Sequence, residues 1–313
     1  MTATKFEIYT GENQQNLPDF TPDYRLTNPE HYKPSKALKS AVNVAITLGK
    51  PLLITGEPGT GKTQLAYSIA NNFGLDKPLV FNTRTSSIAT DLFYRYDALK
   101  HLQYVHSQKN NTLTDDEIEQ KFIQYQAFGQ AIISQQRQVV LIDEIDKAPR
   151  DLPNDILNVL EEMSFDVPEV NKKYIAPDAK RPIVIMTSNS EKNLPDAFLR
   201  RCVYYHLNFP SEDELLTIVA AKLQSEVFTS SNLSSFVIPH FMKIRKLLKR
   251  KKPSTAELIY WVTLLEKFNF HPTKLANVNK LNQEDKDTLR ITYTVLAKTE
   301  DDIKILEQIL FEN

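Results

Sequence analysis

Cysteine and glycine are scarce in this chain. Its 313 residues include one cysteine, Cys202, and only seven glycines. A single cysteine cannot form an internal disulfide, so we expect a reducing compartment, the cytoplasm. No apolar run approaches the roughly 18 residues of a membrane-spanning helix. The first twenty residues lack the apolar core of a secretory signal. These absences exclude a disulfide scaffold and predict a chain without a membrane span.

Neither sign of charge is in excess. There are 38 basic and 39 acidic residues, which gives a net charge of −1. That balance excludes a broadly basic nucleic-acid coat, although it allows a local basic patch. Hydrophobic types make up 41% and charged types 25% of the chain, as in ordinary globular proteins. The length predicts about two domains.

Short apolar runs alternate with helical patterns over the first two thirds of the chain. Four runs are apolar at consecutive positions, as expected of buried parallel strands, and a fifth candidate lies at 204–209. The four runs are 52–54, 79–81, 139–142 and 183–186. Helical spacing predicts helices at 35–48, 64–72 and 153–163. The alternation predicts an α/β fold with a parallel five-stranded sheet and flanking helices.

Pattern and composition divide the chain into three parts. Residues 1–30 are polar and rich in Asn, Gln and Pro, and we expect an N-terminal arm there. Residues 31–210 hold the α/β pattern, with long connections near 93–136, predicted to add a hairpin or helix, and 164–180, predicted to be a hairpin. The pattern from 211 to 313 is helical, and serine with glutamate three positions later marks two helix starts. We therefore expect a small all-helical lid domain at 211–313.

Three of the seven glycines lie within six positions, and they belong to a phosphate-binding pattern. The eight residues are Gly56-Glu57-Pro58-Gly59-Thr60-Gly61-Lys62-Thr63, which fit G-x-x-x-x-G-K-[ST] after an expected strand. Glycines at such a turn let backbone N–H groups surround an anion at a helix N-terminus. We expect all eight residues to bind ATP. Lys62 would reach the β- and γ-phosphates, and Thr63 would bind Mg²⁺.

A second part of the site is expected at the end of the strand 139–142, where Asp143 and Glu144 follow. Two carboxylates at the end of a buried strand are costly unless they act on a cation. With the phosphate loop, they predict that Asp143 holds Mg²⁺ and that Glu144 orients and deprotonates the attacking water. Asp146 and Lys147 come next, either as a solvated surface pair or as further catalytic groups.

A third part follows the strand 183–186, in the turn Thr187-Ser188-Asn189. Ligands of parallel sheets sit beyond the carboxyl ends of the strands, so this turn is expected to face the nucleotide. Asn189 would then bond the γ-phosphate or the attacking water. Ordinary turn chemistry, in which Ser and Asn are common, is the alternative.

Together these motifs resemble those of AAA+ ATPases, and more closely those of MoxR-like ATPases. The resemblance covers about residues 32–265 and rests on PLLITGEPGTGKTQLA (51–66), LIDEIDKAPRDLPNDILN (141–158), TSNSEKNLPDAFLRRC (187–202) and KKPSTAELIYW (251–261). It implies an ATP hydrolase that forms a homo-oligomeric ring, commonly a hexamer, and remodels or activates a protein client like a chaperone. It also implies a separate partner with a von Willebrand factor A domain, because the D-x-S-x-S motif of that domain is absent from this chain.

The resemblance also bears on two arginine positions. Arg201 matches the arginine finger, which completes the catalytic site of a neighbouring subunit, and Arg200 stands beside it. The alternative is a surface or salt-bridging cluster. The chain departs from many AAA+ lids because Thr255 or Ala256 stands where a sensor-2 arginine is common. The sequence therefore does not decide whether the lid contacts nucleotide. An ATP-binding adaptor with slow turnover is accordingly an alternative function.

The segment 243–252, KIRKLLKRKK, holds seven basic residues in ten. An apolar stripe within it predicts an amphipathic helix with a cationic outer face. A solvated lid helix, a contact with a neighbouring subunit and a contact with an acidic client all fit this pattern. Nucleic acid is a less favoured partner because no aromatic residue interleaves the run to stack on bases. The segment is the one support for another alternative, a nucleotide-gated DNA-handling module.

Overall fold

The computed structural model describes residues 9, 11, 27–107, 113–190 and 193–311. The N-terminal arm expected at 1–30 therefore lies almost entirely outside the described residues. The chain divides into two compact units. The α/β unit comprises Pro34–Glu57 and Lys62–Asn208, and the helical unit comprises Met1–Lys33, Pro58–Gly61 and Phe209–Asn313.

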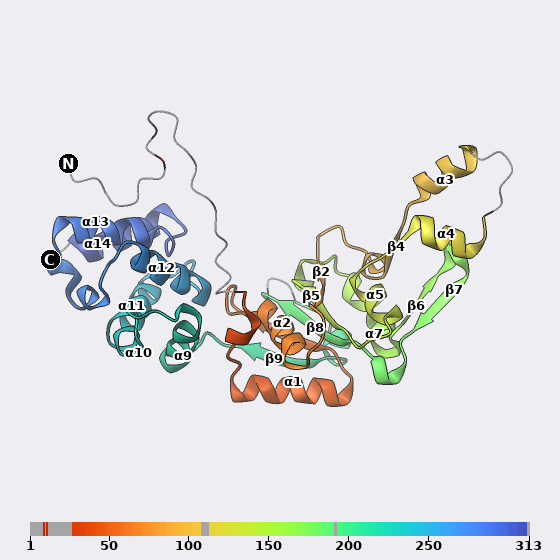
Figure 1. Ribbon diagram of the computed structural model, residues 1–313, viewed down its shortest axis with the longest axis horizontal. Coiled ribbons are helices and arrows are strands. Elements are labelled where there is room, and N and C mark those ends of the chain that lie inside the picture. The colour runs from red at the N-terminus through yellow and green to blue at the C-terminus, as the bar shows by residue number, and fades with distance from the viewer. Residues whose placement is uncertain (1–8, 10, 12–26, 108–112, 191–192, 312–313) are drawn as a thin grey trace. The chain divides into compact units, whose positions relative to one another are not determined.

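A five-stranded parallel sheet forms the centre of the α/β unit (Figure 1). Its strand order is β2-β5-β8-β1-β9, and every neighbouring pair is parallel. The strands are β1 (Leu52–Gly56), β2 (Leu79–Asn82), β5 (Val139–Asp143), β8 (Ile183–Ser188) and β9 (Val203–Leu207). The three central strands are almost wholly buried, which is why their sequences are continuously apolar. The predicted sheet is confirmed, including its fifth strand.

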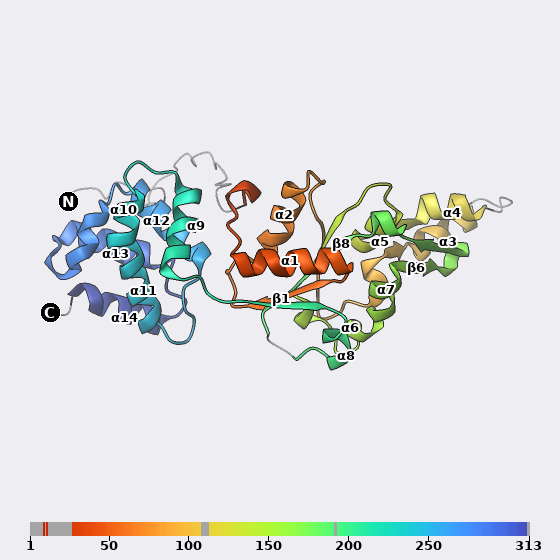
Figure 2. The same ribbon diagram turned by 90° about the horizontal axis from the view of Figure 1, so that it is seen from below.

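Helices flank this sheet. The first, α1 (Lys36–Leu48), begins after Ser35, whose hydroxyl accepts a hydrogen bond from the Leu38 N–H, and it lies along β1 and β9 (Figure 2). The other flanking helices are α2 (Lys62–Asn72), α5 (Ala127–Ile133), α6 (Leu152–Asp155), α7 (Leu157–Glu162) and α8 (Asp196–Leu199). The prediction of a single helix at 153–163 is wrong, because this segment forms two helices, α6 and α7. Ile156 has φ −89° and ψ −3°, at the edge of helical geometry, and separates α6 from α7.

Both long connections carry the extra structure that their length predicted. The first forms an antiparallel hairpin that encloses two helices, and the second forms a plain antiparallel hairpin. The elements of the first are β3 (Tyr94–Tyr96), α3 (Ala98–Ser107), α4 (Asp115–Phe122) and β4 (Ile123–Tyr125), and those of the second are β6 (Ser164–Val167) and β7 (Lys172–Ile175).

A partly buried carboxylate joins the two inserts. Glu119 of α4 accepts hydrogen bonds from the hydroxyls of Tyr125 and Tyr174, which come from β4 and β7. Lys172 Nζ, also from β7, lies 2.5 Å from Glu119 Oε2. Burial alone would raise the pKa of Glu119, but the hydrogen bonds from Lys172, Tyr125 and Tyr174 hold this pKa below its ordinary value. The inserts therefore form one connected arm.

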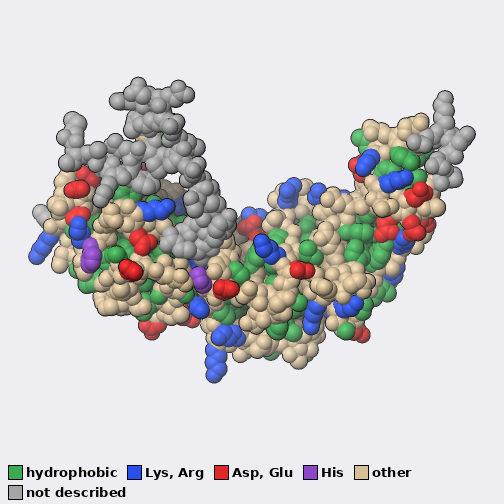
Figure 3. Space-filling model, viewed as in Figure 1, with side chains coloured by type: hydrophobic (Ala, Val, Ile, Leu, Met, Phe, Trp, Pro, Cys, Tyr) green, Lys and Arg blue, Asp and Glu red, His purple; other side chains and the backbone are tan. Residues whose placement is uncertain are grey.

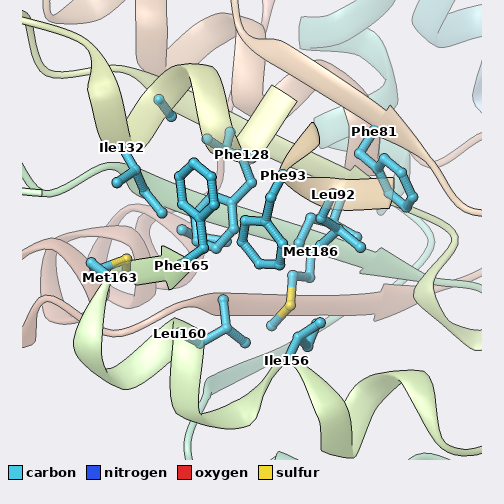
Figure 4. Packing of buried hydrophobic residues seen from close by; sticks show 14 of the residues in the cluster. Phe81, Leu92, Phe93, Phe128, Ile132, Ile156, Leu160, Met163, Phe165 and Met186 are labelled. Atoms are coloured by element: carbon cyan, nitrogen blue, oxygen red, sulfur yellow. The ribbon is translucent and has the colours of Figure 1, made fainter. Parts of the chain in front are cut away.

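Aromatic side chains fill the core between the sheet and the inserts (Figure 4). The ring centroids of Phe93 and Phe165 lie 5.2 Å apart, and those of Phe93 and Phe128 lie 5.6 Å apart. Phe165 belongs to β6, so the second insert shares the core of the sheet rather than projecting from it unsupported. Such packing fixes where the helix before β6 must lie.

The helical unit has a hydrophobic core of its own, centred on the fully buried Trp261. Its helices are α9 (Glu212–Leu223), α10 (Ser230–Asn232), α11 (Ile238–Leu247), α12 (Thr255–Lys267), α13 (Gln283–Tyr293) and α14 (Glu300–Phe311). Capping boxes at Ser211 and Ser254 start α9 and α12, as predicted.

The helix α3 exposes apolar side chains. None of its residues is buried, and Leu99, Leu102 and Val105 are at least half exposed. Hydrophobic side chains accordingly show among charged ones at the α3–α4 end of the α/β unit (Figure 3). Over the described ranges, no helix combines the length and the apolar character that crossing a bilayer requires.

Candidate nucleotide-binding site

The phosphate loop follows β1 and leads into α2. All three of its glycines have positive φ values: 149° at Gly56, 72° at Gly59 and 91° at Gly61. A side chain at Gly56 would also collide with the backbone carbonyl oxygen of Leu207 in β9. The loop therefore needs glycine for its conformation. It delivers the chain to Lys62, the first residue of α2, where unpaired helix N–H groups favour an anion.

Lys62 is buried at the edge of the sheet where the strands end. Its Nζ donates to the carbonyl oxygens of Gly56 and Glu57, at 2.8 and 2.9 Å, and to Asn189 Oδ1 at 2.8 Å. Burial lowers the pKa of Lys62, whereas surrounding carboxylates, Asp143 foremost, raise it. Three oxygen acceptors thus hold a desolvated ammonium group beside the phosphate loop.

Oxygen ligands for a divalent cation meet next to Lys62. Thr63 Oγ1 donates to the Asp143 carboxylate, at 3.1 Å from Oδ1 and 3.3 Å from Oδ2. Mg²⁺ prefers oxygen and keeps several positions for water and phosphate, so one hydroxyl and one carboxylate fit its requirements. Within the described residues, no cluster of three or more His, Cys, Asp or Glu offers a complete protein cage for a metal. The donor set therefore fits Mg²⁺ held jointly with phosphate.

Glu144 follows β5 in a left-handed conformation, with φ 56° and ψ 50°. Its two carboxylate oxygens have different partners. Asn189 Nδ2 donates to Oε1 at 3.1 Å, and Lys147 Nζ lies 2.5 Å from Oε2. Since Asn189 also accepts from Lys62, one amide connects the ammonium group of the phosphate loop to Glu144. Asn189 thus contacts the site itself, which the alternative of plain turn chemistry did not predict.

Three further residues belong to this site. Thr187 at the end of β8 donates to the Asp143 carboxylate and accepts from the Glu144 N–H at 2.9 Å. Asp146 is 2% exposed and accepts from the Asn189 N–H at 3.1 Å, so it is not a solvated surface group. The sequence left Asp146 and Lys147 undecided, and it placed Thr187 in the turn that faces the nucleotide without giving it a role. The strand pairing explains the contact, because Thr187 lies one residue beyond the β5–β8 pair Ile142–Met186.

Arg201 is not part of this group. Its described contacts are Glu161 Oε1, 2.7 Å from Nε, and the Ala197 carbonyl oxygen, 3.2 Å from Nη1. Cys202 next to it is partly buried, and burial raises the pKa of its thiol to about 12. A thiol with such a pKa stays protonated at neutral pH and is not a nucleophile.

The start of α12 carries no arginine. Ser254 is the N-cap and Thr255 the first helical residue, with Thr255 buried. Two arginines precede this helix start, Arg245 and the exposed Arg250. Arg245 is committed within the helical unit: its guanidinium stacks on the Phe209 ring and donates to the Pro253 carbonyl oxygen at 2.6 Å.

Residues 51–202 match the family model of the AAA domain, dynein-related subfamily. This match covers just under half of the chain and supports an AAA+ ATPase domain. Its fold is that of AAA+ P-loop NTPases, and the match implies nucleotide hydrolysis in general and, typically, Mg²⁺ at this AAA+ site. AAA+ proteins typically form oligomers.

Solved structures of Thermotoga maritima RuvB resemble the chain at low identity. One point mutant of that RuvB is 17% identical with a TM-score of 0.46, over 88% of this chain and 75% of that chain. The structure titled RuvB Holliday junction branch migration motor is 18% identical with a TM-score of 0.43, over 88% and 74%. Similarity this low carries no information on what the chain binds. A comparison with curated proteins gives no match.

Proposed function

We propose that the chain is a Mg²⁺-dependent ATPase of the MoxR-like type, which works as a homo-oligomeric ring, commonly a hexamer, on a protein client. Residues 31–210 would be its nucleotide-binding domain and 211–313 its lid. The observation that carries the proposal is the connection from Lys62 through Asn189 to Glu144, beside the Thr63–Asp143 pair. It brings phosphate, metal and water chemistry together at one edge of the sheet.

Each side chain has a separate task in this proposal. Lys62 binds the β- and γ-phosphates of ATP, and Thr63 and Asp143 hold Mg²⁺. The metal, when bound, neutralises charge that develops on the phosphate oxygens. Glu144 accepts a proton from the attacking water, and Asn189 aligns that water or the γ-phosphate with Glu144. The remaining loop residues Gly56 to Gly61 contribute backbone N–H groups.

The contacts of Arg201 support the proposed ring. Its contacts with Glu161 and Ala197 leave it outside the phosphate site of its own chain, so a catalytic role for Arg201 requires a neighbouring copy. An arginine supplied in trans stabilises charge in the transition state of phosphoryl transfer. A client with a separate von Willebrand factor A domain, in the cytoplasm, fits the MoxR-like type.

Steady-state ATP hydrolysis combined with light scattering tests the proposal. We expect wild type to hydrolyse ATP and to assemble when ATP is present. Glu144→Gln should assemble but lose turnover, and Arg201→Ala should lose turnover by about 10³-fold or more. If wild type binds ATP and assembles without appreciable turnover, the chain is instead an ATP-binding adaptor. If it neither binds nor hydrolyses ATP, the proposal fails.

A second candidate function, DNA handling, is favoured by the basic segment 243–252. Of its seven basic residues, Arg245 is buried, while the other six are exposed on α11 and just beyond its end. The helix ends at Leu247, so four of them extend beyond it rather than lying on the outer face of a helix. The contact of Arg245 with the Pro253 carbonyl oxygen fixes the end of this segment.

DNA binding measured across salt concentrations tests this candidate. Phosphate contacts would make the logarithm of affinity fall with the logarithm of salt concentration, by about 0.9 per contact. Replacing Lys249, Arg250 and Lys251 by Gln should reduce this slope. The matched control replaces the exposed Lys36, Lys39 and Lys77 of the α/β unit by Gln and should leave it unchanged. Equal effects of both triple variants, or no affinity at low salt, exclude DNA handling.

A further inference from the structure

Arg201 is held by a carboxylate of its own chain. Nε of Arg201 lies 2.7 Å from Glu161 Oε1, and Nη1 donates to the Ala197 carbonyl oxygen at 3.2 Å. Glu161 stands 40 residues away in sequence, on α7, so the pair is not a product of local helix spacing. A guanidinium group in these contacts is turned toward its own subunit.

The core fixes both ends of this pair. Glu161 stands on α7 next to Leu160 and two residues before Met163, and these two side chains are 2% and 1% exposed. Arg201 follows the fully buried Phe198 and precedes Cys202, which packs against the same core. Neither backbone can move far without disturbing packed side chains. The two charged groups therefore meet because the fold brings them together.

The pair is nevertheless easy to separate. Side-chain exposure is 35% for Arg201 and 54% for Glu161, and exposed ion pairs contribute little to stability. A phosphoryl group offers the guanidinium charge-assisted hydrogen bonds at least as strong as those of one carboxylate oxygen. An Arg201 side chain could thus exchange Glu161 for the phosphate of a neighbouring site, while its backbone stays in place.

We propose that Glu161 is a positioning residue that holds Arg201 on its own subunit until a neighbouring subunit presents bound nucleotide. The inference rests on the proposed role of Arg201 as a finger in trans. Glu161 touches neither substrate nor the reacting atoms in this scheme. It sets the concentration at which subunits cooperate, because each new interface must first displace the Arg201–Glu161 contact.

The test is ATP hydrolysis as a function of protein concentration, at saturating ATP and Mg²⁺. Glu161→Gln removes the charge but keeps the size of the side chain. We expect the protein concentration that gives half-maximal turnover to fall by about two- to fivefold, the range that the loss of one exposed ion pair allows. Maximal turnover should not fall, because Arg201 itself is intact.

Glu162→Gln is the matched control. Glu162 stands at the next position of α7, is also exposed, and contacts Ser164 instead of Arg201. It should behave as wild type. The two substitutions are also made in the Arg201→Ala background, with assembly followed by light scattering. There Glu161→Gln should have no effect, since the group that it restrains is gone.

The outcomes separate the inference from the function on which it rests. Three outcomes overturn the inference alone. In the first, Glu161→Gln shares the half-maximal protein concentration of Glu162→Gln, and in the second it loses maximal turnover. The third outcome is that Glu161→Gln shifts assembly equally in the wild-type and the Arg201→Ala backgrounds. Turnover in wild type that does not depend on protein concentration, or that survives Arg201→Ala, overturns the trans finger and the inference with it.

Discussion

The side-chain nitrogen of Asn189 donates to Glu144 Oε1 at 3.1 Å. The oxygen of the same amide accepts from Lys62 Nζ at 2.8 Å. An uncharged amide can donate to a carboxylate through its nitrogen and accept from an ammonium group through its oxygen. Asn189 therefore links Glu144 to Lys62, the residue expected to bind phosphate.

Asn189→Asp keeps the shape of the side chain and removes its donor. We expect turnover to fall by about 10²-fold or more, because Glu144 loses a hydrogen bond and gains a like charge beside it. ATP binding should persist, since Lys62 keeps its other contacts. Asn43→Asp on the exposed face of α1 is the control for the added charge. Wild-type turnover in Asn189→Asp would contradict the role of this amide.

Lys147 occupies the other oxygen of Glu144, at 2.5 Å, and both side chains are partly exposed. A water molecule needs one of these oxygens to be accessible. We expect Lys147→Met to raise turnover by about two- to fivefold, the range for losing one exposed ion pair. Single-turnover hydrolysis at saturating ATP measures it, and Lys77→Met, an exposed lysine of the same unit, is the control. A decrease would mean that Lys147 positions Glu144 for catalysis instead.

Two glycines with positive φ allow strain and collision to be separated. Gly49, φ 61°, faces open space, whereas a Cβ at Gly56 would meet the Leu207 carbonyl oxygen. Gly49→Ala should cost about 1–2 kcal/mol of unfolding free energy, for the left-handed backbone alone. Gly56→Ala should cost about 1–3 kcal/mol more, because the obstructing atom belongs to a strand backbone. Urea unfolding measures both, and equal costs would rule out the close approach.

Local patterns made the fold and most of the site predictable from the sequence. The apolar runs of β1, β5 and β8, the glycines of the phosphate loop and the two capping boxes each act within a few neighbouring residues. The same holds for Asp143 and Glu144, which simply end a strand. These features do not depend on which strands become neighbours.

The features that escaped prediction depend on distant neighbours or on a single backbone angle. Thr187 meets Asp143 only because β8 lies beside β5, across 44 residues of sequence. Lys147 reaches Glu144 where Glu144 adopts a left-handed conformation, which no residue type nearby requires. The break of the helix at Ile156 is of the same kind. Strand order and individual dihedral angles come from the packing of the whole unit.

Acid should loosen the connection between the two inserts. The folded-state pKa of Glu119 is below its ordinary value, because hydrogen bonds from Lys172, Tyr125 and Tyr174 outweigh its burial. A depressed carboxylate pKa contributes stability that is complete above the unfolded-state pKa, near 4.5, and is lost as pH falls through the folded-state pKa. Glu119→Gln should therefore reduce the unfolding free energy at pH 7 by about 1–3 kcal/mol, as for hydrogen bonds to a charged group.

The difference between wild type and Glu119→Gln should shrink as pH falls below 4.5, because the wild-type carboxyl group then becomes neutral as well. Urea unfolding at a series of pH values measures it. Asp166→Asn is the matched control, since Asp166 is an exposed acid of β6. A difference that stays constant down to about pH 3 would mean that the Glu119 charge does not hold the inserts together, and that the tyrosine hydroxyls need only an acceptor of any kind.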